Sequence, residues 1–282
     1  MYEIKNHLRN ILVKKHVIPL ESSWYEQTGG QTNKVWRVVG EQDLICKLYQ
    51  NSQNNPLFKN MPEDEYRCLK WLEGSNIAPK PYKLLETELG MVLLYHYVDG
   101  ALWSNDLNAV SDLLCRIHEH KILKGLRIIS GLPSQIQTSG LKIINNLNNK
   151  CKNELTKICP NVIISEIEPV LVHTDVVVGN LIFGNQGLRL IDWQCPALGD
   201  PVLDIAMFLS PGMHEIYGSG KLSMKDHEIF LMNLTPKLRS RYNILGPLYH
   251  WRLAAYCFWK AEQGFIDYEN AALAEIDLLK MI

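Results

Sequence analysis

The sequence has no run of apolar residues long enough to cross a lipid bilayer, which takes about 20 residues in a helix. Lys5, Arg9, Lys14 and Lys15 interrupt the N-terminal stretch, so it lacks the continuous apolar segment of a signal peptide. Low-complexity stretches and internal repeats are also missing. We therefore expect a cytoplasmic globular protein with no membrane partner.

The chain also lacks an excess of charge of either sign. Its 282 residues include 29 Lys and Arg against 30 Asp and Glu, a formal net charge of -1. A nucleic-acid partner or an anionic membrane surface would favour a clear basic excess, so neither is expected. With 46% hydrophobic residues, the chain can bury a sizeable core as one large domain or as two lobes.

No CxxC pair occurs among the cysteines, which are odd in number and widely spaced. This pattern argues against a disulfide framework and against a structural zinc site. We interpret them as reduced thiols, mostly buried. They are Cys46, Cys68, Cys115, Cys151, Cys159, Cys195 and Cys257.

A glycine-containing loop, TGGQTN at residues 28–33, leads into a predicted β-hairpin of residues 34–39 and 44–49. Glycines let a backbone approach a phosphate and offer it N–H groups. The same pattern is typical of an ordinary turn, so the loop alone indicates a phosphate site only weakly. Before it, residues 4–15 have the apolar spacing of a short packing helix.

Lys47 lies in the second strand of this hairpin among apolar neighbours. A lysine there is often an edge or solvent-facing residue, which is the alternative interpretation. The next predicted helix, residues 61–73, begins with a proline and two acids and places Glu65 on the same face as Leu69. A carboxylate on that inward face needs a cation, and Lys47 is the nearest candidate in the sequence.

Apolar runs at residues 83–86 and 91–98 predict two more strands, which complete a small, mainly antiparallel sheet with one helix. An AspGly pair then breaks the pattern, and the rest of the chain is mostly helical. We predict an α+β fold with an N-lobe of residues 1–98 and a C-lobe of residues 99–282, and a hinge at about 95–100. A nucleotide base would fit between such lobes.

The most informative stretch is HTDVVVGNLIFGNQGLRLID, residues 173–192. Its GNQG turn separates two short apolar runs, which predicts a β-hairpin with Phe183 opposite Leu188. Counting outward along both strands puts Asn180 opposite Ile191. The open end of this hairpin therefore begins at Asn180.

Polar side chains gather at that open end. Asn180 and Asp192 emerge there together, and Asp175, five residues before Asn180, can fold back over it. Two oxygen ligands and a free carboxylate would then meet in a small volume, which suits a metal-assisted reaction. Asp204, which precedes a short apolar helix, is interpreted as a structural residue that holds the loop backbone.

Helical spacing predicts a core helix at residues 107–120 and a single surface helix at residues 141–158. From residue 225 onward the chain is expected to form helices broken near Pro236, Gly246 and Gly264.

One of these C-terminal helices concentrates aromatic side chains. Aromatics all round a helix are typical of deep burial, although some can face a pocket and bind a cation. Trp251 and Trp259 are the candidate substrate contacts. The cluster consists of Tyr249, Trp251, Tyr256, Phe258 and Trp259.

Together these motifs resemble the aminoglycoside phosphotransferase and choline kinase family, which has a two-lobed protein-kinase-like fold. The combination of an HxDxxxxN motif with the later IDW and GDPxxDxA motifs is specific, and the resemblance spans roughly residues 20–210. It rests on GGQTNKVWRV at 29–38, ICKLY at 45–49, EYRCLKWL at 65–72, VHTDVVVGNLIF at 172–183, LIDW at 190–193 and GDPVLDIA at 199–206.

The resemblance implies an ATP- and Mg²⁺-dependent kinase that phosphorylates a hydroxyl of a small molecule. It implies that Asp175 accepts the hydroxyl proton and that Asn180 and Asp192 hold Mg²⁺. The implied nucleotide contacts are the phosphate-covering Gly29, Gly30, Thr32 and Asn33, the phosphate-binding Lys47 paired with Glu65, and the backbone near Tyr95 and Tyr97, which receives adenine.

Several positions depart from the family pattern. Thr174 stands where glycine is frequent, residues 176–178 are all valine where polar residues are common, and Gln194 replaces a frequent Glu. These departures leave the proposed phosphate and metal contacts in place, but they bear on the substrate. Protein-kinase activity is disfavoured because HisArgAsp, AspPheGly and AlaProGlu motifs are absent from the sequence.

Three functions remain open at this point. The glycine loop and the aromatic helix favour a choline-, ethanolamine- or thiamine-like acceptor. An aminoglycoside would need an acidic cleft, for which the chain offers C-terminal acids. A non-catalytic nucleotide-binding module is the third possibility, although such proteins typically lose the lysine, the base or a metal ligand. The C-terminal acids are Glu262, Asp267, Glu269, Glu275 and Asp277.

Overall fold

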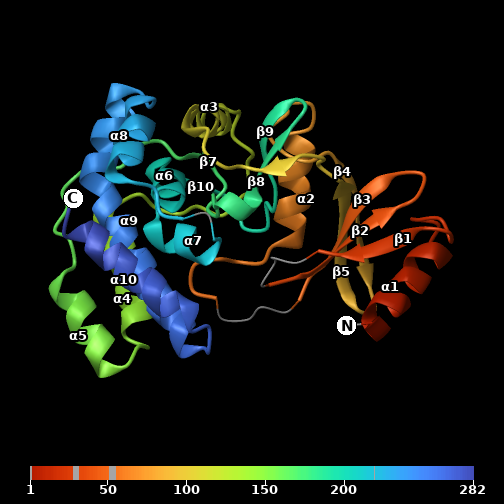
Figure 1. Ribbon diagram of the computed structural model, residues 1–282, viewed down its shortest axis with the longest axis horizontal. Coiled ribbons are helices and arrows are strands. Elements are labelled where there is room, and N and C mark those ends of the chain that lie inside the picture. The colour runs from red at the N-terminus through yellow and green to blue at the C-terminus, as the bar shows by residue number, and fades with distance from the viewer. Residues whose placement is uncertain (1, 28–31, 51–54, 219) are drawn as a thin grey trace.

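The computed structural model of the chain describes residues 2–27, 32–50, 55–218 and 220–282. Figure 1 shows a β-sheet with its helices at one end of the molecule and a larger group of helices at the other. This confirms the predicted two-lobed α+β fold. Gly29 and Gly30 of the predicted phosphate loop lie outside the described residues. The lobe boundary at about 95–100 stays a prediction.

The N-terminal part of the chain forms a five-stranded antiparallel sheet in the order β1-β2-β3-β5-β4. Alternation along β3 sends Cys46 to the face that packs with Leu8 of α1, and sends Ile45 to the face that packs with Leu69 of α2. The strands are β1 (Ser23–Glu26), β2 (Lys34–Val39), β3 (Asp43–Leu48), β4 (Pro81–Thr87) and β5 (Gly90–His96), with helices α1 (Tyr2–Lys14) and α2 (Pro62–Trp71).

The C-terminal part is built around one long helix, α9, which packs against α4, α6 and α10. In the described ranges, no helix is both long and apolar enough to span a membrane. The helices are α3 (Leu107–His118), α4 (Pro133–Ile144), α5 (Asn149–Lys157), α6 (Val202–Phe208), α7 (Pro211–Ile216), α8 (Met224–Met232), α9 (Pro236–Glu262) and α10 (Asp267–Leu279).

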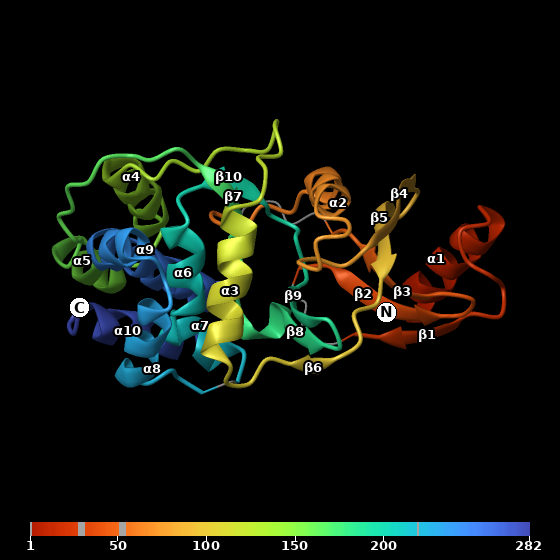
Figure 2. The same cartoon turned by 90° about the horizontal axis from the view of Figure 1, so that it is seen from above.

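Short strands on the side of this helical group that faces the sheet carry the central motif (Figure 2). The predicted hairpin is confirmed, with Phe183 opposite Leu188 and the Ile191 N–H donating to the Asn180 carbonyl at 2.9 Å. The elements are β6 (Ala101–Leu102), β7 (Val170–Val172), the 3-10 turn η1 (Val178–Asn180), β8 (Leu181–Gly184), β9 (Gly187–Leu190) and β10 (Ala197–Gly199).

Two helix predictions are wrong. The single helix expected at residues 141–158 is two helices, because α4 ends at Ile144 and the Asn148 side chain caps a new helix by accepting the Cys151 N–H. The break expected near Gly246 does not occur, since α9 continues through it. Burial on many sides holds this segment helical against the local preference of its glycine and the following proline.

All seven cysteines are free thiols. Cys46, Cys68, Cys195 and Cys257 are buried and the other three are partly buried. The prediction of mostly buried thiols is therefore confirmed, and their reduced state stays a prediction.

Gly140 of α4 generates a stability prediction. A Cβ at this position would lie 2.2 Å from Cζ3 of Trp251, whose side chain is fully buried. The clash outweighs the helix-propensity gain of alanine, so Gly140→Ala should lower the free energy of unfolding by about 2 kcal/mol. Urea unfolding measures this change. Gln135→Ala on the exposed side of α4 is the control and should change stability by less than about 0.5 kcal/mol; equal effects of the two variants would contradict the packing argument.

Candidate active site

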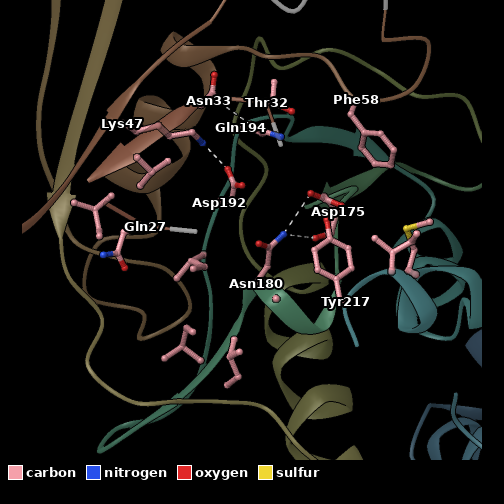
Figure 3. A pocket seen from close by; sticks show the side chains of 18 of the residues that line it. Gln27, Thr32, Asn33, Lys47, Phe58, Asp175, Asn180, Asp192, Gln194 and Tyr217 are labelled. Carbon is pink, nitrogen blue, oxygen red and sulfur yellow. Dashed lines mark hydrogen bonds and ion pairs between the residues drawn. The ribbon is translucent and has the colours of Figure 1, made fainter. Parts of the chain in front are cut away.

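A cavity of about 790 Å³ opens between the sheet and the helical group (Figure 3). One end is lined by apolar side chains of the sheet, including Val35 and Ile45, and the other by residues of α7, α9 and α10. Lys47, Asp175, Asn180 and Asp192 line the middle, so the residues predicted for the chemistry surround one cavity.

Lys47 lies between two carboxylates that come from different parts of the chain. Its Nζ is 2.7 Å from Glu65 Oε2 and 2.5 Å from Asp192 Oδ1, and the side chain is 2% exposed. Burial alone would lower the pKa of Lys47, but the charges of Asp192 and Glu65 outweigh it and raise that pKa above its usual value. The Tyr49 hydroxyl donates a further hydrogen bond to Glu65. Lys47 is therefore held in place as a charged ammonium, not at a solvent-facing edge.

Asn180 connects the hairpin to Asp175. Its Nδ2 donates to the Asp175 carbonyl at 3.0 Å and to Asp175 Oδ2 at 3.3 Å. The Asn180 amide oxygen and the Asp192 carboxylate then remain as hard oxygen donors directed into the cavity (Figure 3). Hard oxygens are the ligands that Mg²⁺ takes, so this pair fits a magnesium ion bound together with phosphate groups.

His173 supports the backbone of Asp175. Its ring is fully buried against Trp193, with ring centroids 4.6 Å apart. The Ile191 carbonyl accepts from Nε2 at 3.1 Å, and Nδ1 accepts the Asp175 N–H at 3.2 Å. Burial lowers the pKa of His173 to about 4, so the ring is neutral at physiological pH and both hydrogen bonds persist.

Burial, followed by the nearby charge of Asp192, raises the pKa of Asp175 to about 7. The Asn180 amide and the Lys47 charge act in the opposite direction. A carboxylate that titrates near neutral pH is suited to accept a proton from a hydroxyl.

Two of the four non-glycine residues with left-handed backbone in the described chain lie at this site. Thr174 and Asp192 adopt left-handed conformations with φ of 73° and 63°. The Asp204 carboxylate stabilises the strained backbone at Thr174, because it accepts the Thr174 N–H at 2.8 Å and the His173 N–H at 3.0 Å. This agrees with the interpretation of Asp204 as a residue that holds the loop. The left-handed conformation is also the reason why the departure from glycine at 174 is unfavourable for the backbone.

Asn33 also lines the cavity, but its side chain bonds to other residues around it. Its Nδ2 donates to Gln194 Oε1 and to Asn60 Oδ1, both at 2.9 Å, and its Oδ1 accepts the Gln50 N–H at 3.0 Å. The network ties the end of the glycine loop to the loop after Asp192. Gln194 thus serves as a partner of Asn33 in this chain. Thr32 lines the same part of the cavity.

Tyr95 and Tyr97 mark the segment expected to receive adenine. The Tyr95 side chain is buried at the cavity wall, and the Tyr97 ring lies under the Arg37 guanidinium at 3.7 Å. The Tyr97 N–H donates to the Asp43 carbonyl at 2.9 Å, so it is already used within the sheet. Both side chains line the cavity, and Val98 continues the apolar wall beside them.

Aromatic rings, most of which the sequence did not single out, form the far end of the cavity. Phe58 meets Tyr256 edge to face with centroids 5.0 Å apart, and Tyr217 and Tyr268 complete this aromatic end together with Lys260. Asn55 Nδ2 reaches the Tyr256 hydroxyl at 3.2 Å and joins the N-terminal part of the chain to α9. Only Tyr256 belongs to the aromatic cluster noted in the sequence. The others come from separate segments, so no local pattern identifies them.

The structure does not bring Trp251 to the cavity, which corrects its assignment as a substrate contact. Its ring extends from α9 into the core against Gly140 of α4, where it is fully buried, and its Nε1 donates to the Leu155 carbonyl at 2.8 Å. Trp259 stacks on Tyr256 with centroids 5.8 Å apart, one layer behind the cavity wall. The aromatic residue of this helix that faces the cavity is Tyr256.

A two-lobed fold in which a lysine paired with a buried glutamate shares one cavity with two acids and an amide is that of a kinase-like protein. The chain belongs to the phosphotransferase enzyme family, whose model matches residues 26–220. This confirms the resemblance drawn from the motifs.

Individual relatives are more distant. A thiamine kinase from Shigella boydii serotype 4 (strain Sb227) is 27% identical over 154 residues, which is 50% of this chain and 50% of that protein. The chain thus spans about half the length of the curated relatives it matches.

Solved structures share the fold over nearly the whole chain. A choline/ethanolamine kinase family protein from Mesorhizobium loti has a TM-score of 0.69 at 13% identity, covering 98% of this chain and 94% of that one. Spectinomycin phosphotransferase, in complex with ADP and spectinomycin, has a TM-score of 0.64 at 13% identity, covering 98% and 92%. At these identities the likeness concerns the fold alone.

The left-handed backbone at Thr174 predicts a difference between two small replacements. Both Thr174→Gly and Thr174→Ala remove the side-chain hydrogen bond to Cys195, but only glycine adopts a φ of 73° without strain. Thr174→Gly should therefore be more stable than Thr174→Ala by about 1 kcal/mol in urea unfolding. A more stable alanine variant would show that the loop relaxes to another conformation.

The raised pKa of Asp175 predicts a pH dependence of stability in the nucleotide-free protein. An unfolded Asp titrates near pH 4, whereas folded Asp175 titrates at about 7. The resulting stabilisation is complete below about pH 4 and is lost as pH rises through about 7. Asp175→Asn lacks this loss, so its stability relative to wild type should rise by on the order of 4 kcal/mol between pH 4 and 8. Urea unfolding at several pH values tests this, and a constant difference would refute the raised pKa.

Proposed function

We propose that this protein is an ATP-dependent, Mg²⁺-assisted kinase that phosphorylates a hydroxyl of a small molecule. The observation that carries the proposal is the placement of Lys47, Glu65, Asp175, Asn180 and Asp192 around one cavity. Phosphoryl transfer needs positioning and neutralisation of charge more than covalent chemistry, and these residue types supply both.

Each side chain has a role in this proposal. Lys47, oriented by Glu65, binds the α- and β-phosphates, and the apolar walls of the sheet enclose the adenine. Asp175 accepts the proton of the acceptor hydroxyl, which its pKa of about 7 permits near neutral pH. Asn180 and Asp192 would hold Mg²⁺. The ion, when bound, neutralises charge on the phosphate oxygens.

The aromatic end of the cavity favours an acceptor with one cationic or flat aromatic group. Phe58, Tyr217, Tyr256 and Tyr268 offer ring faces and edges on the side of the cavity next to Asp175. Such rings bind a single quaternary or aromatic cation without a carboxylate. We therefore prefer an amino alcohol of the choline, ethanolamine or thiamine kind, in line with the thiamine kinases among the relatives.

An aminoglycoside acceptor is less well supported, because several ammonium groups would need several carboxylates. None of the C-terminal acids considered for that purpose lines the described cavity. Glu275 is fully buried, and Glu262 accepts hydrogen bonds from Asn148. The acids in question are Glu262, Asp267, Glu269, Glu275 and Asp277.

A panel of phosphorylation assays with ATP and choline, ethanolamine, thiamine or kanamycin tests the proposal. We expect turnover with at least one of the first three acceptors. Asp175→Asn should lower kcat by at least about 100-fold, because the proton acceptor is lost, while the Kd for nucleotide changes little. Asp112→Asn, on the exposed side of α3, is the matched control and should keep the wild-type kcat.

The outcomes separate the three candidate functions. Activity on kanamycin alone would replace the amino-alcohol preference with an aminoglycoside acceptor. Binding of MgATP without turnover on any acceptor would favour the non-catalytic nucleotide-binding module. Equal kcat of wild type and Asp175→Asn would remove Asp175 from its role as the base.

A further inference from the structure

A second, smaller cavity of about 110 Å³ lies behind the catalytic loop. Phe58 lines both cavities, and Thr174, the residue before Asp175, lines the smaller one. Two arginines from distant parts of the chain, Arg127 and Arg252, meet at its wall together with Tyr249. The cavity is therefore close to the active site but has its own set of polar groups.

Arg252 is buried and Arg127 is partly buried, and both are poorly paired. Arg252 is 7% exposed, and its guanidinium lies 5.0 Å from the Tyr249 ring centroid. In the part of the chain that the structure describes, Arg252 Nε, Arg127 Nε and the Tyr249 hydroxyl have no hydrogen-bond partner. Arg127 donates one bond, from its Nη2 to the Cys195 carbonyl at 2.9 Å. Three polar groups at one small cavity are thus left without a protein acceptor.

The charge at this cavity is also uncompensated. No ion pair joins Arg127 or Arg252 to an acid within the described ranges, and the residues outside those ranges include no Asp or Glu. A third buried arginine shows the contrast, since Arg241 Nε donates to Asp200 at 2.7 Å. Burial and the repulsion from Arg127 lower the pKa of Arg252, in keeping with two cations that face one space. A buried cation without a counter-ion is strongly unfavourable.

We propose that this cavity binds a small oxyanion of the phosphate class, with Arg127, Arg252 and Tyr249 as its donors. Guanidinium groups bind phosphate through forked hydrogen bonds, and the tyrosine hydroxyl adds a donor from another direction. A tetrahedral ion presents oxygens in several directions and can accept from all three. The volume suits one such ion or one phosphate group and excludes a nucleotide.

Thermal unfolding of the full-length chain in sodium phosphate, compared with sodium chloride at equal ionic strength, tests the site. Phosphate at about ten times its Kd should raise the wild-type Tm by roughly 3 °C. Arg252→Met keeps the length of the side chain but removes the charge, so this rise should disappear. Lys47→Met is the matched control, because it removes the cation of the nucleotide cavity, and it should keep the rise.

Two further measurements complete the test, one without phosphate and one with a phosphorylated organic ligand. In phosphate-free buffer Arg252→Met should have a Tm at least equal to that of wild type, since it removes an unpaired buried charge. If that variant does not fold, Arg127→Met takes its place with the same expected loss of the phosphate response. Glycerol 3-phosphate in place of phosphate distinguishes the source: a larger shift assigns the site to a phosphorylated organic ligand, an equal or smaller one to the free ion.

Three results would overturn the proposal. They are the absence of any phosphate-specific rise in the wild-type protein, an undiminished rise in both arginine variants, and loss of the rise in Lys47→Met with retention in Arg252→Met. The last of these would assign phosphate to the nucleotide cavity. None of these measurements requires the protein to be an active kinase, so the test is independent of the proposed function.

Discussion

The contact of the Lys47 ammonium with Glu65 and Asp192 is the interaction on which the rest of the site depends. It joins a sheet strand, the helix behind that strand and the loop after the hairpin at distances of 2.7 and 2.5 Å. A buried charge of this kind is tolerated only while all partners are present. The two lobes are therefore connected through a polar contact in the cavity itself. A ligand bound in the cavity would compete for this contact or strengthen it.

Some features of this site can be predicted from the sequence and others cannot. Register and helix periodicity are local, so the hairpin that brings Asn180 beside Asp192 and the inward face of Glu65 follow from spacing alone. The aromatic end of the cavity does not, because Phe58 and Tyr217 come from irregular segments whose neighbours are set by tertiary packing. Trp251 shows the converse, a candidate chosen by residue type whose position against α4 makes it a core residue.

Behind the catalytic loop, one carbonyl connects the active site to the smaller cavity. The Cys195 oxygen accepts from both Thr174 Oγ1 and Arg127 Nη2, each at 2.9 Å. Thr174 is held in a left-handed conformation beside Asp175, and Arg127 belongs to the proposed oxyanion site. Two hydrogen bonds at this carbonyl therefore join the proposed oxyanion site to the residue before Asp175.

Helix α9 contributes residues to both cavities and to the Asp200 contact along its length. Arg241 near its start binds Asp200, Arg252 in its middle lines the small cavity, and Tyr256 and Lys260 near its end line the aromatic end of the large one. Substitutions in the last turns of α9 would reshape the aromatic end of the large cavity. They would leave Arg241 and Arg252, in the earlier turns, unchanged. Under the proposed function, a few positions on one helix could thus change the acceptor while the residues proposed for the phosphate chemistry stay the same, which is a route to new substrates without a new fold.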